Sequence, residues 1–146
     1  MGGRIKKYCF ILFLFFFTGR LCSQMPADSV DIATYNLLMK GNWDDMMLLA
    51  RKSIHSGTDF HYLRLRMGIY YYNKANYRRA SHHLVKAYKM YSAYDLNNEY
   101  LYYACLWGGR ETDSYFYANR FSPELKNKIG FKKRYFDYLF SDFTYT

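Results

Sequence analysis

The sequence predicts an all-α protein built from about three helix–turn–helix pairs, followed by a C-terminal capping segment. Two observations favour this fold class. A residue pattern returns after 34 positions, and turn residues separate segments of helical length whose starts often bear a capping side chain. Helix pairs of this kind stack into an α-solenoid, because one pair alone leaves an apolar face that only a neighbouring pair covers.

The repeat is clearest where two helices would be joined by a turn. Residues 40–46 (KGNWDDM) align with residues 74–80 (KANYRRA), which lie 34 positions later, as Lys, a small residue, Asn, an aromatic, two charges and an apolar residue. A further 34 positions lead to residues 108–114 (GGRETDS), which keep the turn chemistry and a small last residue. The spacing therefore predicts repeat copies at 27–60, 61–94 and 95–128.

Local start and stop signals predict seven helices. The expected elements are about 29–40 with Asp28 or Ser29 as cap, one after Asn42, about 59–73, 77–91 after Asn76, 95–107, a short helix from Thr112 or Asp113 to about Asn119, and a last one after Ser122-Pro123 that ends near Gly130.

The middle copy contains the most specific motif. It has Met67-Gly68-x-x-Tyr71 in its first helix and Tyr77-x-x-Ala80-x-x-x-Leu84-x-x-Ala87 in its second. This pattern resembles the tetratricopeptide family, whose repeat, about 34 residues long, is a helix, a turn and a helix. The chain departs from the family at Arg64, where a large apolar residue is usual, and at Ser92, where Pro is frequent.

The motif also makes sense in terms of packing. Gly68 and Ala80 are expected where two antiparallel helices cross closely, since only small side chains let the backbones approach. Tyr71, Tyr77 and Leu84 are expected to fill the space on either side.

The first 24 residues are typical of a secretory signal. Arg4, Lys6 and Lys7 precede an apolar run at 9–17, which is shorter than the roughly 20 residues that a membrane-spanning helix needs. The sequence thus predicts an exported protein of the periplasm or cell envelope, or a secreted one. An uncleaved anchor and a buried helix are the alternatives. Lipid attachment at Cys22 is a further alternative, which the preceding Arg20-Leu21 disfavours.

The segment 131–146 differs from the rest, because it is rich in aromatic residues and its polar residues alternate only in part. A helical or irregular cap on the last repeat is the preferred interpretation, and a strand is the alternative. The strand motivates a rival hypothesis for the whole chain, in which the repeats are an N-terminal accessory domain of an outer-membrane β-barrel or envelope complex. Residues 131–146 would then begin the lead-in to the strands of the barrel.

The sequence offers no motif for catalysis, a cofactor or a metal ion. His82 and His83 are adjacent and would diverge on a helix, His55 and His61 are expected to be solvated loop residues, and Cys105 falls on an apolar face. Asp44 and Asp45 suit a helix start better than acid–base chemistry. The expectation is a protein without enzymatic activity. The formal charge of +9 does not indicate nucleic-acid binding in an exported chain, and membrane association and oligomeric state stay open.

A binding surface is the remaining prediction. The resemblance implies that the first helix of each pair lines a concave groove, where a protein or peptide partner in the envelope would bind through aromatic anchors. The residues expected to contact the partner are Tyr35, Tyr62, Arg66, Tyr72, Asn73, Tyr100, Tyr103 and Trp107, with Met39, Ile69 and Glu99 beside them.

Overall fold

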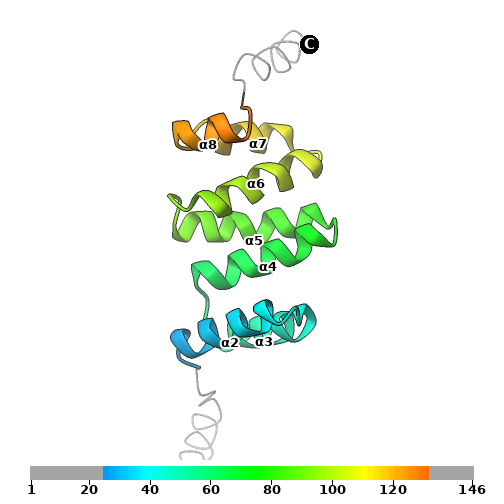
Figure 1. Cartoon of the computed structure of the whole chain (residues 1–146), viewed down its shortest axis with the longest axis vertical. Coiled ribbons are helices and arrows are strands. Elements are labelled where there is room, and N and C mark those ends of the chain that lie inside the picture. Colours follow the sequence, from blue (N-terminus) through cyan, green and yellow to red (C-terminus); the bar gives the residue numbers. More distant parts are fainter. Residues whose placement is uncertain (1–24, 132–146) are drawn as a thin grey trace, which may run out of the picture.

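The computed structural model describes residues 25–131, and these form helices joined by short turns, without a strand. The helices are α2 (Ala27–Met39), α3 (Trp43–His55), α4 (His61–Asn73), α5 (Tyr77–Met90), α6 (Asp95–Trp107), α7 (Glu111–Ala118) and α8 (Pro123–Lys128). Figure 1 shows them stacked along the long axis of the molecule, with α2 and α3 at one end and α7 and α8 at the other. The chain has the predicted all-α, solenoid-like fold. The predicted signal (1–24) and all of the C-terminal segment except Phe131 lie outside the described residues.

The helix starts confirm the predicted repeat interval. The first helices of the three pairs begin at Ala27, His61 and Asp95, and the second helices begin at Trp43, Tyr77 and Glu111. Only the third pair departs from the pattern, because α7 ends at Ala118 and the short helix α8 follows it.

The turn inside each pair has the same backbone geometry in all three copies. Its left-handed residue is Gly41, Ala75 or Gly109, with φ of 71°, 53° and 67°. The next N–H in each turn donates to a carbonyl five residues earlier, in each case over 2.9 Å. This bond ends the first helix and directs the chain into the second.

Three of the predicted helix caps are confirmed. Asn42 and Asn76 accept hydrogen bonds from the N–H groups of the third residue after them, and Ser122 does the same ahead of Pro123. Other starts differ from the prediction. Helix α2 begins at Ala27 after Pro26, without a side-chain cap, and α7 begins at Glu111.

Helix α4 begins at His61 and not at Asp59, because the backbone of Phe60 is extended, with φ of −151° and ψ of 165°. The Asp59 carboxylate ahead of it bonds to a side chain of the helix. Its partner is Arg64, which the family resemblance marked as a departure. The guanidinium is buried, donates to the Asp59 carboxylate through two bonds of 2.6 and 2.5 Å, and approaches the His83 Nδ1 atom at 3.2 Å. An ion pair between the buried Arg64 and the more exposed Asp59 thus replaces the expected apolar contact.

The crossing of α4 and α5 lies where the motif predicted it. A Cβ atom added at Gly68 would come within 2.5 Å of Leu84 Cγ, and both Ala80 and Leu84 are fully buried. Tyr71 is buried as well, and Tyr77 is half-buried against the Tyr72 ring. The absence of a side chain at Gly68 lets these two helices pack closely.

The buried apolar residues form two clusters. The larger cluster runs through α2 to α6, and the smaller one joins α6 to α7 and α8 around Tyr102, Ala118, Phe121, Leu125 and Ile129. The third pair is therefore completed by α8, which covers the apolar surface that the short α7 leaves open.

Candidate functional site

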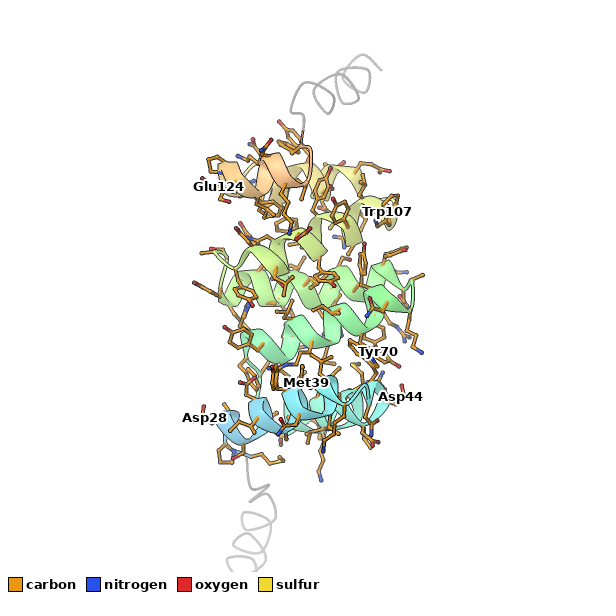
Figure 2. All side chains as sticks on the ribbon, in the orientation of Figure 1. Asp28, Met39, Asp44, Tyr70, Trp107 and Glu124 are labelled. Atoms are coloured by element: carbon orange, nitrogen blue, oxygen red, sulfur yellow. The ribbon has the colours of Figure 1, made fainter. Side chains whose placement is uncertain are left out.

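The residues predicted to bind a partner all come from the first helices of the pairs, α2, α4 and α6. These helices contact one another directly, α2 with α4 and α4 with α6, although each belongs to a different pair. Large side chains remain exposed along this face, including Tyr35 at 49%, Tyr62 at 43% and Trp107 at 59%. Figure 2 shows Trp107 at one end of α6.

At the end of this face that α6 forms, the structure brings several predicted residues together. Tyr72 meets Tyr100 edge to face at a centroid distance of 5.1 Å, and Tyr103 stacks with Trp107 at 6.4 Å. A pocket of about 290 Å³ opens here, and we call it the tyrosine pocket. It is lined by Tyr72, Leu96, Glu99, Tyr100 and Tyr103.

The rings of the tyrosine pocket hold one another in place. Tyr72 is half-buried, and its ring packs against those of Tyr77 and Tyr100. Burial raises the pKa of the Tyr72 phenol, and the nearby Trp107 side chain acts in the opposite direction. The phenol is therefore neutral at physiological pH. Fixed rings lose little conformational entropy when a ligand binds.

Sequence reasoning missed Leu96 as a lining residue. It is exposed by 43% and lies one helical turn before Tyr100. The signal that could have found it is this spacing of four residues, which places two side chains on the same face of a helix.

Arg66 was expected to be available to a partner, and the structure gives it an internal role. The residue is exposed by only 8%, and its guanidinium donates to Asp31 Oδ1 over 2.6 Å and to Thr34 Oγ1 over 2.9 Å. It also lies against the rings of Tyr35 and Tyr62, at 5.6 and 5.9 Å from their centroids. Arg66 thus links α4 to α2, and the two tyrosine rings beside it remain exposed to solvent.

Asn73 lies apart from the tyrosine pocket. It is exposed and lines a separate hollow of about 340 Å³ together with Gly41, Asn42, Trp43, Asp44, Tyr70 and Lys74. In this hollow the Tyr70 hydroxyl donates to Asp44 Oδ1 over 2.9 Å, a pair that is labelled in Figure 2. This hydrogen bond raises the pKa of Tyr70.

The four histidines lie on three different helices, α3, α4 and α5. Among residues 25–131, no three His, Cys, Asp or Glu side chains gather in a way that could hold a metal ion. Burial, with the charge of Arg64 as a second cause, lowers the pKa of His83 to about 4. The same residue stacks on Tyr71 with an angle of 12° between the rings.

His61 is not the solvated loop residue that the sequence suggested. It is the first residue of α4, it is half-buried, and its ring meets Tyr62, Tyr91 and Tyr94 edge to face at 5.1 to 5.5 Å. Its Nδ1 atom lies 3.1 Å from the Ala87 carbonyl oxygen. His61 therefore helps to join α4 to the end of α5.

Cys105 is fully buried, as expected from its apolar face. Burial raises the pKa of the thiol to about 11, so the reactive thiolate is strongly disfavoured. This environment suits a packing role for the residue.

None of the helices within residues 25–131 combines the length and the apolar character that crossing a membrane requires. No protein family, no curated protein and no solved structure matches the chain.

Proposed function

We propose that this chain is an exported repeat protein of the tetratricopeptide type, which binds a protein or peptide partner without transforming it. The binding surface is the face made by α2, α4 and α6, here called the tyrosine face and defined by Tyr35, Tyr62, Tyr72, Tyr100, Tyr103 and Trp107.

The regular backbone supports the family assignment. Three helix pairs begin at one regular interval, with the same turn geometry in each, and Gly68 lies at a close helix crossing. Close helix packing of this kind leaves the outward side chains of the first helices in one continuous row. Export is proposed from residues 1–24, whose basic start and short apolar run are typical of a signal.

The observation that best supports binding is the tyrosine pocket. Its rings are fixed by mutual contacts, and Trp107 at its edge is exposed by 59%. Tyrosine and tryptophan dominate the binding energy of many protein interfaces, because they bury a large area at little entropic cost. A folded domain gains nothing for its own stability from leaving such rings exposed.

The proposal can be tested with peptides selected from a displayed random library against the full chain. We expect the double variant Tyr72→Ala/Tyr103→Ala to weaken binding by at least about tenfold, since one hot-spot residue contributes about 2 kcal/mol or more. Phe116→Ala is the matched control, because this exposed ring belongs to α7 and not to the tyrosine face.

Tyr72 and Tyr103 also pack against the core, so circular dichroism must show that the double variant is folded. Trp107→Ala removes a more exposed ring and serves as a second test. Peptides that bind both folded variants as tightly as the original chain would rule out the tyrosine face. Export is tested separately by fusing residues 1–24 to a phosphatase that is active only outside the cytoplasm.

A further inference from the structure

The first two pairs of helices together form a complete site for a guanidinium group, and it is filled by the chain itself. Asp31 and Tyr35 lie one turn apart on α2, and Tyr62 of α4 completes the site. The Arg66 guanidinium bonds to the Asp31 carboxylate over 2.6 Å and lies 5.6 and 5.9 Å from the two ring centroids. A carboxylate with flanking aromatic rings is the combination that attracts an arginine side chain.

The repeat places the same pair of residue types in the third copy. Glu99 and Tyr103 on α6 stand two repeat intervals after Asp31 and Tyr35, and they are again one turn apart. The middle copy has Leu65 and Ile69 at these positions and offers no carboxylate. The acid and the tyrosine therefore recur together only in the two outer copies.

In the third copy these residues belong to the tyrosine pocket. Glu99 and Tyr103 line it together with two further tyrosine rings. A second hollow of about 210 Å³ adjoins it, since the two share Leu96 and Glu99, and it is also lined by Asp95, Glu124, Leu125 and Lys128. Three carboxylates and one ammonium group thus line the two hollows at this end of the tyrosine face.

The ion pair between Lys128 and Glu99 shows that the Glu99 carboxylate attracts a cation. Lys128 of α8 donates to Glu99 Oε2, and this bond raises the pKa of Lys128. The pair is easily exchanged, because the Lys128 side chain is 64% exposed and ion pairs of exposed groups are weak. The Glu99 side chain is the less exposed partner, at 24%.

We propose that the tyrosine pocket receives an arginine or lysine side chain of the partner peptide, which bonds to Glu99 in place of Lys128 and lies against the rings of Tyr100 and Tyr103. Arginine is the better fit, because its planar guanidinium can bond to a carboxylate and stack on an aromatic ring at the same time. This inference rests on the proposed function and specifies the chemistry of its partner.

The test uses the full chain and two matched pools of short random peptides, one with arginine fixed at the centre and one with citrulline, its neutral analogue. We expect the arginine pool to bind more tightly. Glu99→Gln should weaken binding of the arginine pool by about tenfold, as loss of a charge-assisted hydrogen bond predicts, and leave the citrulline pool unchanged. Lys128→Gln should strengthen binding of the arginine pool by removing the competing ammonium.

Glu111→Gln on α7 is the control, because this exposed carboxylate does not line the pocket. If the peptides bind, lose affinity in Tyr72→Ala/Tyr103→Ala and yet do not distinguish Glu99→Gln or citrulline, the cation site is overturned while the binding function stands. If no peptide binds either to this chain or to the variant in which Lys132, Lys133 and Arg134 are replaced by alanine, the proposed function itself fails.

Two other occupants would also overturn the inference. If a second copy of the chain occupies the pocket, the chain should self-associate, and Glu99→Gln should abolish this self-association. If the chain's own basic residues occupy the pocket, peptides should bind only after Lys132, Lys133 and Arg134 are all replaced by alanine.

Discussion

The middle and third helix pairs both pack a small residue against a large one, but the two residues lie on opposite helices of the pair. In the middle pair the small residue is Gly68 on the first helix, and the large one is Leu84 on the second. In the third pair the corresponding positions, one repeat interval later, hold Tyr102 and Ala118, both buried in one cluster. The repeat thus preserves the space between the helices and not the identity of the residue on each side.

The two pairs also differ in how far their charged side chains are exposed. The middle pair buries Arg64 and joins it to Asp59. The third pair has Arg110 and Asp113, whose side chains are both 41% exposed. The third pair thus lacks both this ion pair and the Gly68–Leu84 arrangement that made the middle copy recognisable, although its backbone follows the same path.

The largest expected effect concerns the close crossing. Gly68→Val should lower the free energy of unfolding by about 1–3 kcal/mol or more through overpacking, and Leu84→Ala by about 2–5 kcal/mol through the cavity it leaves. The double variant imitates the size distribution of the third pair, so its cost should be smaller than the sum of the two single costs. Chemical denaturation measures all three. Strictly additive costs would mean that the two residues do not share one space.

The ion pair of the buried Arg64 gives the next effect. Asp59→Asn should cost about 1.5–3 kcal/mol of stability, because it leaves the Arg64 guanidinium buried beside a neutral amide. Asp113→Asn removes the exposed pair of the third copy and should cost about 0–1 kcal/mol. If denaturant titrations gave equal losses for both variants, burial would not be what distinguishes the two pairs.

The burial of His83, with the charge of Arg64 as a second cause, predicts a pH dependence of stability. The folded pKa of His83 is about 4, below the value near 6.5 of an unfolded histidine, so the unfolded chain binds the extra proton first as the pH falls. Stability should be fully present above about pH 6.5 and decline toward pH 4. His83→Gln should flatten this decline in unfolding measured at several pH values. His55→Gln on α3 is the matched control, because it replaces an exposed histidine with the same residue.

The smallest effect concerns the turns. Ala75 has the left-handed conformation that glycine occupies in the other two copies, at φ of 53°. Ala75→Gly should therefore stabilise the chain by about 0.5–1 kcal/mol, because relief of backbone strain exceeds the added freedom of the unfolded chain. Gly41→Ala should have the opposite sign. Thermal unfolding of the two variants tests this, and a loss of stability in Ala75→Gly would contradict the strain argument.

Much of the fold could be predicted from the sequence, since its signals are local. Asn42, Asn76 and Ser122 identified helix starts because a capping side chain acts within three residues of its own position. The starts of α2 and α4 were misjudged for a related reason. Pro26 precedes α2 without a side-chain cap, and the extended backbone of Phe60, also without a side-chain cap, delays the start of α4 to His61.

The candidate site could be predicted only in part. Tyr72, Tyr100 and Tyr103 were assigned to one face, and the structure brings them together. Arg66 and Asn73 were assigned to the same face, yet one is held internally by Asp31 and the other lines a different hollow. Position along a helix predicts the face on which a side chain lies. It does not predict which neighbouring residue already forms an ion pair with that side chain.

By itself, the sequence determined the number of helices between residues 25 and 131, the interval between them and the face that bears the tyrosines. These properties follow from the helical period and from caps and turns, which depend on residues a few positions apart. Only the tertiary structure decided that Leu96 and Glu99 join Tyr72 in one pocket, that Arg66 is buried and that α8 completes the third pair. These outcomes depend on side chains far apart in the chain, and their contacts exist only after the helices have packed.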